Sequence, residues 1–186
     1  MISFEKLETY FGRLRVREKP TKGGGLFLPS SLATVNLALE QLLKSKTFDS
    51  SRLFFDAGFG DGRILLLTAG VYGIPSAGAE YDEELAERAE YHIGEIRKLD
   101  TVRDKIAPIT LAIGDFGTDE TYSKVGIIFE DIATFYNYAN HPYQIAEKIV
   151  RLSPRGTKFF YHGGRRDFEG LILEQRIGDK FHVYRK

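Results

Sequence analysis

The chain has 186 residues, with 26 basic and 26 acidic side chains and no cysteine. A chain of this length fits one α/β domain that buries about 70% of its unfolded surface, so it needs no disulfide. The lack of cysteine excludes thiol nucleophiles and cysteine metal sites and fits a cytoplasmic location. The balanced charge disfavours nucleic acid as a partner, although a local basic patch stays open. With no membrane-length apolar run and no signal-peptide pattern at the start, we expect a cytoplasmic protein without a membrane partner.

The first 25 residues predict a short helix followed by a basic, glycine-rich arm. Apolar residues recur at helical spacing over residues 2–14, and the segment 13–22 is rich in arginine and lysine before Gly23-Gly24-Gly25. The arm is either a lid that contacts substrate or a solvated loop, and the second interpretation is favoured. We therefore divide the chain into residues 1–25, a helix and arm, and residues 26–186, the functional domain.

Residues 26–31 lead into the first helix of this domain. Leucines and a valine fall on one helical face over residues 32–42. Ser30 or Ser31 is the expected N-cap, and Pro29 precedes it. The pattern predicts a helix that runs directly ahead of the first strand of the sheet.

An apolar run over residues 52–57 is followed by alternating glycines and then by an apolar helix over residues 64–69. The glycines therefore form a strand-to-helix turn, which is where an open α/β sheet binds ligands. Missing side chains let the backbone approach a ligand, and free N–H groups at the helix start face it. A glycine turn without a ligand is the alternative.

The spacing in this turn is acid-x-Gly-x-Gly-x-Gly, beginning at Asp56. It differs from the Gly-x-Gly-x-x-Gly of dinucleotide folds and resembles motif I of the seven-strand (class I) S-adenosylmethionine-dependent methyltransferases. That cofactor carries a positive amino group and a sulfonium, which a carboxylate suits better than a phosphate-binding turn. The resemblance implies that the cofactor contacts a run of motif residues: Asp56, Gly58, Phe59, Gly60 and Gly62. In the family a Pro-Ser/Thr turn before the preceding helix also lies against the cofactor, which implies contacts from Phe27, Pro29 and Ser30.

A second short strand over residues 76–79 ends at Glu80. The segment Gly78-Ala79-Glu80-Tyr81-Asp82 resembles the family pattern in which the acid binds both ribose hydroxyls of the cofactor. The resemblance implies that Tyr81 stacks on the adenine and that Asp82 caps the next helix. A surface carboxylate at an acid-rich helix start is the alternative for Glu80.

A third strand, over residues 109–114, ends at Asp115-Phe116. This resembles the third family motif, in which the aspartate accepts a hydrogen bond from the adenine amino group and the next residue packs on the ring. Three strands therefore each end in an acid. At one edge of a parallel sheet the three acids line one crevice, whereas each alone is a helix-capping residue.

The fourth strand is predicted over Val125–Phe129, followed by Glu130-Asp131 and an aromatic loop to Tyr138. Family members place reacting residues here, so Glu130, Asp131 and Tyr136 are candidate catalytic residues, and Glu130 is also a candidate cofactor contact. The stretch departs from the Asn/Asp-Pro-Pro-Tyr signature of enzymes that methylate exocyclic base nitrogens, and the lack of cysteine closes the covalent route to pyrimidine carbon-5. The alternative is that the acids cap the next element and the aromatics fill the core.

The remaining elements complete a methyltransferase-like order. A helix begins at His141-Pro142-Tyr143, a fifth strand covers residues 157–161, and residues 171–177 and 181–185 predict a hairpin around Gly178-Asp179. The loop 162–167 either touches substrate or is a solvated connection, and the latter is favoured. The predicted fold is a three-layer α/β, Rossmann-like, seven-stranded sheet, mostly parallel, with a C-terminal antiparallel hairpin.

The resemblance implies an enzyme that transfers a methyl group from S-adenosylmethionine to a nucleophile. The compact size resembles the protein-lysine methyltransferases of this class, and Phe135, Tyr136, Tyr138 and Glu130 are candidates for a channel that deprotonates a lysine amine. Transfer to RNA or to a small molecule, and a non-catalytic cofactor-binding or scaffold role, are the alternatives. The four histidines lack metal-ligand spacing. The sequence leaves the acceptor and the oligomeric state open.

Overall fold

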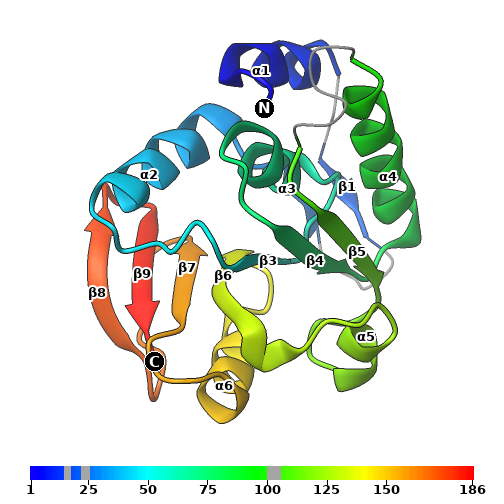
Figure 1. Cartoon of the computed structure of the whole chain (residues 1–186). Helices are drawn as coiled ribbons and strands as arrows, with labels where there is room; N and C mark the ends of the chain where they lie inside the picture. Colours follow the sequence, from blue (N-terminus) through cyan, green and yellow to red (C-terminus); the bar gives the residue numbers. More distant parts are fainter. Residues whose placement is uncertain (15–17, 22–25, 100–105) are drawn as a thin grey trace.

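The computed structural model describes residues 1–14, 18–21, 26–99 and 106–186. One sheet of seven strands runs through the molecule in the order β5-β4-β3-β6-β7-β9-β8, with helices on both faces (Figure 1). Neighbours from β5 to β7 are parallel, and β9 is antiparallel to both β7 and β8. The strands are β3 (Leu53–Ala57), β4 (Ser76–Glu80), β5 (Ile109–Ile113), β6 (Ile132–Tyr138), β7 (Lys158–His162), β8 (Ile172–Ile177) and β9 (Phe181–Arg185). The predicted seven-stranded sheet with its terminal hairpin is confirmed.

The helices fall into two layers, which two hydrophobic clusters define. One cluster joins α1, α2, α3 and α4 to one face of the sheet, and the other joins α5 and α6 to the opposite face. Because side chains alternate along a strand, Phe54 of β3 belongs to the first cluster and Phe55 to the second. The helices are α1 (Phe4–Arg13), α2 (Leu32–Lys44), α3 (Arg63–Leu66), which continues as a π-helical turn at Leu67–Val71, α4 (Glu83–Arg97), α5 (Asp119–Ser123) and α6 (Pro142–Leu152).

Helix starts follow the predicted capping chemistry. Ser31 caps α2, where its hydroxyl accepts from the N–H of Thr34 at 3.4 Å. Asp82 caps α4, where its carboxylate accepts from the N–H groups of Glu84 and Leu85 at 3.1 and 3.3 Å. These three bonds satisfy N–H groups that have no partner within the helix. The predicted starts of these two helices are confirmed.

The fourth strand lies later in the chain than the sequence predicts. The N–H groups of Val125 and Ile127 donate to the carbonyl of Tyr122, so this segment wraps the end of α5 and does not join the sheet. The strand is β6, which pairs with β3 and β7 and has buried residues from Ile132 to Asn137. The prediction of a strand over 125–129 is wrong, because a short β-branched run cannot be distinguished by composition from one that packs beside a helix.

The N-terminal segment packs on the domain by its helix. α1 buries Leu7 and Phe11, and a two-stranded ribbon pairs β1 (Lys19–Pro20) with β2 (Leu26–Phe27). The whole predicted glycine hinge, Gly23-Gly24-Gly25, and part of the basic arm lie outside the described residues. The division at residue 25 stays a prediction, and the β1–β2 ribbon spans it.

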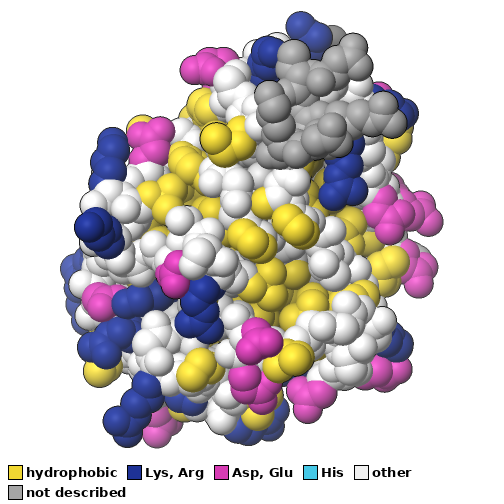
Figure 2. Space-filling view, viewed as in Figure 1, with side chains coloured by type: hydrophobic (Ala, Val, Ile, Leu, Met, Phe, Trp, Pro, Cys, Tyr) yellow, Lys and Arg dark blue, Asp and Glu magenta, His cyan; other side chains and the backbone are white. Residues whose placement is uncertain are grey.

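Charge is unevenly spread over the face seen in Figure 2. Lysine and arginine gather over the edge formed by β8 and β9, whereas aspartate and glutamate gather over α4. A net charge of zero therefore coexists with local fields of both signs. Within the described residues, no helix is both long enough and apolar enough to cross a bilayer.

Candidate active site

A pocket of about 900 Å³ opens at the carboxyl edge of the parallel strands. Its two sides differ in chemistry. One side follows β3, β4 and β5 and is formed by acids and glycine backbone, and the other follows β6 and is formed by aromatic and amide residues. The first side includes Asp56, Gly58, Phe59, Gly60, Glu80, Tyr81, Asp115 and Phe116. The second side includes Tyr136, Tyr138, Asn140 and Tyr143, with Arg166 from the segment after β7.

The acid at the end of β3 is buried without a partner for one of its oxygens. Asp56 is 2% exposed, and within the described part of the chain its Oδ1 has no hydrogen-bond donor. Burial raises the pKa of this carboxyl well above its usual value, and the nearby charges of Glu80 and Asp61 raise it further. A buried, unsatisfied acceptor at a pocket wall is costly for the free protein and favours a cationic donor as ligand.

The acid at the end of β4 holds the glycine turn in place. One oxygen of Glu80 accepts from the N–H of Gly60 at 2.8 Å, and the other accepts from the N–H of Asp82 at 2.9 Å. Burial raises the pKa of Glu80, while these backbone bonds oppose the shift. Each carboxylate oxygen keeps a further lone pair for a ligand. Backbone groups that follow β3 and β4 therefore fix the position of this carboxylate at the pocket.

The three glycines of the turn have different roles. Gly60 has φ +56°, and a Cβ there would lie 2.5 Å from the ring of Phe27, which covers the turn. Gly62 has φ +77°, and its Cβ would lie 2.8 Å from the Cβ of Ala89 in α4. Gly58 and Gly60 line the pocket, whereas Gly62 lies outside the lining and allows α3 to pack closely on α4.

An ion pair that the sequence analysis did not single out braces the same turn. The guanidinium of Arg63 binds the buried carboxylate of Asp61 at 2.6 Å and donates to the carbonyl of Ser30 at 3.2 Å. It also lies 5.0 Å from the ring centroid of Phe11 in α1. The pair thus connects the glycine turn to the segment before α2 and to the N-terminal helix. Two opposite charges at positions i and i+2 were the available signal.

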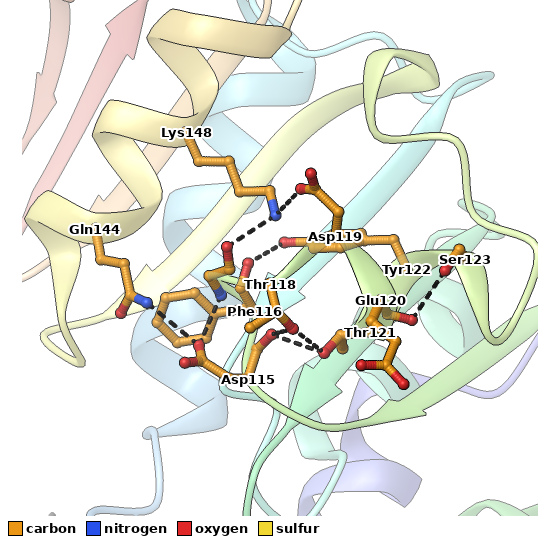
Figure 3. A network of polar contacts seen from close by, with 11 residues as sticks. Asp115, Phe116, Thr118, Asp119, Glu120, Thr121, Tyr122, Ser123, Gln144 and Lys148 are labelled. Carbon is orange, nitrogen blue, oxygen red and sulfur yellow. Dashed lines mark hydrogen bonds and ion pairs between the residues drawn. The ribbon is translucent and has the colours of Figure 1, made fainter.

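The acid after β5 belongs to a network that connects its loop to α6 (Figure 3). The carboxylate of Asp115 accepts from the N–H of Gly117 at 2.7 Å and from the amide of Gln144 at 3.3 Å. Phe116 beside it is buried against the core. The three predicted acids, Asp56, Glu80 and Asp115, therefore all line one pocket.

A buried lysine completes that network. Lys148 of α6 is 3% exposed, binds Asp119 at 2.7 Å and donates to the carbonyl of Gly117 at 3.1 Å. Its ammonium lies 4.5 Å from the ring centroid of Tyr122. These contacts satisfy the buried charge and hold the loop after β5 against α6, as Figure 3 shows.

On the other side, Tyr136 occupies the floor of the pocket. It lies beside Asp56 in the register of β3 and β6, and its hydroxyl shares hydrogen bonds with Ser30 Oγ (3.3 Å) and His162 Nδ1 (2.9 Å). Burial raises the pKa of Tyr136 well above its usual value and lowers the pKa of His162 to about 4. Both groups are therefore neutral near pH 7.

The loop after β6 is held in an uncommon backbone conformation. Ala139 and His141 have φ values of +50° and +46° on either side of Asn140. The amide of Asn137, fully buried, donates to the carbonyls of Ala57 and Asn140 at 2.8 Å each. Left-handed conformations at non-glycine residues cost free energy and occur where surrounding contacts determine them, often at functional sites. Asn137 and Asn140 are not among the site residues predicted from the sequence, although two amide side chains within an aromatic run were a signal for them.

Two of the three candidate catalytic residues lie away from the pocket. Glu130 and Asp131 belong to a 3₁₀ turn (Phe129–Asp131) before β6, so they lie at the amino edge of the sheet. At about 3.3 Å per residue, Asp131 lies roughly 16 Å along the strand from Tyr136. This misplacement follows from the wrong strand prediction, and neither residue lines the pocket. Pro29 also lies outside the lining, although Phe27 and Ser30 belong to it.

The corrected strand changes which residues are compared with the Asn/Asp-Pro-Pro-Tyr signature. β6 ends at Tyr138, and the residues that follow include Asn140-His141-Pro142-Tyr143. This tetrapeptide agrees with the signature at three of four positions and has His141 in place of the first proline. The sequence-based reason for disfavouring base nitrogens as acceptors therefore does not hold. No cluster of potential metal ligands occurs among the described residues.

The strand order, the terminal hairpin and a pocket at the carboxyl edge define the class I methyltransferase fold. No family model matches the sequence, and no curated protein matches it. Solved structures do match. An RNA methyltransferase from Salinibacter ruber in complex with S-adenosyl-L-homocysteine is 21% identical, with a TM-score of 0.56 over 85% of this chain and 92% of that one.

Two further structures agree in fold at lower identity. The rRNA methyltransferase aviRa from Streptomyces viridochromogenes has a TM-score of 0.62 at 9% identity, over 86% of each chain. Magnesium protoporphyrin IX methyltransferase from Synechocystis PCC 6803, with bound S-adenosylhomocysteine, has a TM-score of 0.57 at 11% identity, over 82% of this chain and 80% of that one. The chain has the same fold as these methyltransferases, whose acceptors differ from one another.

Proposed function

We propose that this protein is a methyltransferase that uses S-adenosylmethionine. The observation that carries the proposal is the buried Asp56, whose Oδ1 lacks a donor at the wall of the pocket. The cofactor's positive amino group would satisfy that oxygen and favour the ionised carboxyl. The solved structures with the same fold, two of them with bound S-adenosylhomocysteine, support this choice of ligand.

The other acids of the pocket suit the remaining parts of the cofactor. Glu80 keeps lone pairs for two ribose hydroxyls, and Asp115 offers an acceptor for the adenine amino group. Tyr81 is 60% exposed at the pocket, so its ring is free to stack on the adenine opposite Phe116. The residues present therefore fit the whole cofactor.

When bound, the cofactor supplies an electrophilic methyl group, which passes to a nucleophile as the carbon–sulfur bond breaks and sulfur keeps the electron pair. The chain orients the two reactants by binding them on opposite sides of one pocket. The loop after β6, braced by Asn137, places Asn140 beside Gly58, where the two sides meet. The aromatic residues around it limit access of water.

A lysine amine as acceptor stays a prediction with less support. A lysine ammonium must lose its proton before it attacks, and Glu130 was the carboxylate assigned to accept that proton. Glu130 lies at the opposite edge of the sheet from the pocket. The aromatic residues Tyr136 and Tyr138 do line the pocket and leave room for an amine.

Calorimetric titration with S-adenosylmethionine and S-adenosylhomocysteine tests the proposal. We expect micromolar dissociation constants for the wild-type protein and at least about tenfold weaker binding for Glu80→Gln, because a charged acceptor is lost. Glu87→Gln, on the exposed face of α4, is the matched control and should bind as the wild type does. Absence of binding by the wild-type protein would contradict the proposal.

A further inference from the structure

An arginine is held at the mouth of the pocket by three tyrosines. The Nε of Arg166 donates to the hydroxyl of Tyr161 at 2.9 Å, and its guanidinium lies 5.6 Å from the ring centroid of Tyr143. Its backbone N–H donates to the hydroxyl of Tyr184 at 3.4 Å, and that hydroxyl donates to the carbonyl of Arg166. Although the residue is exposed, both its backbone and its side chain are therefore positioned in advance.

This arginine has donors left over for a ligand. A guanidinium has five N–H donors; Nε donates to Tyr161, and the side chain of Tyr143 engages a further donor, which leaves donors for a ligand. Within the described ranges no carboxylate forms an ion pair with Arg166. The nearest acid in the sequence, Asp167, pairs with Arg165 at 3.6 Å. A fixed guanidinium fork suits phosphate, which it binds through two parallel hydrogen bonds. The mouth of the pocket thus offers an anion site on the side away from the acids.

A stack of three rings ends at the same pocket that Arg166 lines. The ring of Phe181 lies 4.2 Å from His162, and His162 lies 4.1 Å from Tyr138 at an interplanar angle of 13°. Tyr138 lines the pocket, so the stack ends there. Because burial lowers the pKa of His162 to about 4, the stack is uncharged near neutral pH. A flat ring that enters the pocket would continue the stack, as bases do on aromatic side chains.

We infer that the acceptor is a nucleotide unit, whose base stacks on Tyr138 and whose phosphate binds Arg166. Asn140, in the loop that follows Tyr138, offers amide donors and an acceptor to the edge of the base. The inference rests on the proposed methyl transfer and names its substrate class. A cationic lysine side chain would meet an unpaired guanidinium at the same mouth, which disfavours it. Free nucleotides and single-stranded RNA both present this chemistry.

The test is a set of binding titrations, with and without S-adenosylhomocysteine, that compare nucleosides with nucleoside monophosphates for all four ribonucleotide bases. We expect at least one monophosphate to bind about tenfold or more tightly than its nucleoside, because the phosphate adds a charge-assisted bond. Arg166→Gln should abolish this preference. Arg165→Gln, which removes a neighbouring exposed charge outside the pocket lining, should retain it.

A second variant separates stacking from charge. Tyr138→Leu should weaken nucleoside and nucleotide by the same factor, about tenfold, because it removes the platform and leaves the arginine. A single-stranded RNA of eight nucleotides distinguishes RNA from a free nucleotide as the natural ligand. Much tighter binding than the monophosphate indicates RNA, and equal binding indicates a free nucleotide, and both outcomes support the inference.

Two results would overturn it, and they differ from failure of the proposed function. The first is that S-adenosylhomocysteine binds while no nucleotide and no RNA does. The second is that a lysine peptide binds and binds more tightly to Arg166→Gln than to the wild type. If S-adenosylhomocysteine itself fails to bind, the proposed function falls, and the nucleotide titrations without it still decide whether Tyr138 and Arg166 form a nucleotide site.

Discussion

The two sides of the pocket have opposite electrostatic character. The side formed by β3, β4 and β5 carries an excess of acids, because Asp61 pairs with Arg63 while Asp56, Glu80, Asp82 and Asp115 also line it. The side that follows β6 carries aromatic and amide side chains together with Arg166. A cationic group is therefore favoured on the first side and an anionic group on the second. Two reactants of different charge can thus bind in one pocket, each on its own side.

Rigidity also differs between the two sides. On the acidic side the backbone conformation depends on glycines and on hydrogen bonds that backbone N–H groups donate to Glu80, so the volume of any added side chain is the main constraint. On the aromatic side non-glycine residues adopt left-handed conformations. Hydrogen bonds donated by the buried side-chain amide of Asn137 hold this loop in place. We therefore expect a larger side chain to weaken ligand binding most on the acidic side, and the loss of a hydrogen bond to weaken it most on the aromatic side.

The largest effect is expected for Gly60→Ala. At φ +56° and with its Cβ 2.5 Å from Phe27, an alanine would displace the ring that covers the turn. We expect S-adenosylhomocysteine binding to weaken by about a hundredfold, since strain and lost contacts add. Gly62→Ala is the comparison, because its Cβ meets Ala89 and not the ligand. That variant should mainly lower the free energy of unfolding, by about 1–3 kcal/mol in denaturant titrations. Equal loss of binding in both variants would contradict the separation of roles.

A smaller effect, with a defined pH dependence, is expected for Asp56→Asn. Because the folded protein raises the pKa of Asp56, it binds more protons than the unfolded chain above about pH 3.9, so the stabilising contribution is lost as pH rises through the folded pKa. The variant should therefore be more stable than the wild type at neutral pH, with a Tm rise of about 2–4 °C for each kcal/mol gained. Its binding of S-adenosylhomocysteine should nevertheless be about tenfold weaker.

The wild-type protein supplies the matching measurement. A cationic ligand favours the ionised carboxyl, so binding should release protons below the raised pKa of Asp56 and should tighten as pH rises toward that pKa. Calorimetry in buffers of different ionisation enthalpy measures the release. A pH-independent affinity would show that Asp56 does not face the ligand's charge. A variant less stable than the wild type at neutral pH would show instead that the buried carboxyl does not destabilise the free protein.

The sequence was enough to expect the acids of this side at one edge of the sheet, because each of their signals is local; their contact with a cofactor stays a prediction. A strand, an acid and glycines follow one another at Asp56–Gly62, and similar short patterns end β4 and β5. The aromatic side depends on which apolar run joins the sheet. Residues 125–129 and 132–138 are both short and apolar, and only pairing with β3 and β7 selects the second. The Tyr161, Tyr143 and Tyr184 contacts of Arg166 join separate elements and leave no signal at a fixed spacing.

The smallest effect is expected where the sequence first placed catalysis. Glu130→Gln and Asp131→Asn lie at the amino edge of the sheet, so we expect binding of S-adenosylhomocysteine and of nucleotides to change by less than about twofold. Tyr136→Phe, the third candidate, removes hydroxyl bonds to Ser30 and His162 at the pocket floor and should alter nucleotide binding measurably. If either Glu130→Gln or Asp131→Asn bound these ligands about tenfold more weakly, the sequence-based assignment of catalytic residues would be restored. That result would also require the amino edge of the sheet to lie near the ligand. The pairing of Leu53 with Ile132 opposes this, because it fixes the start of β6 at the edge opposite the pocket.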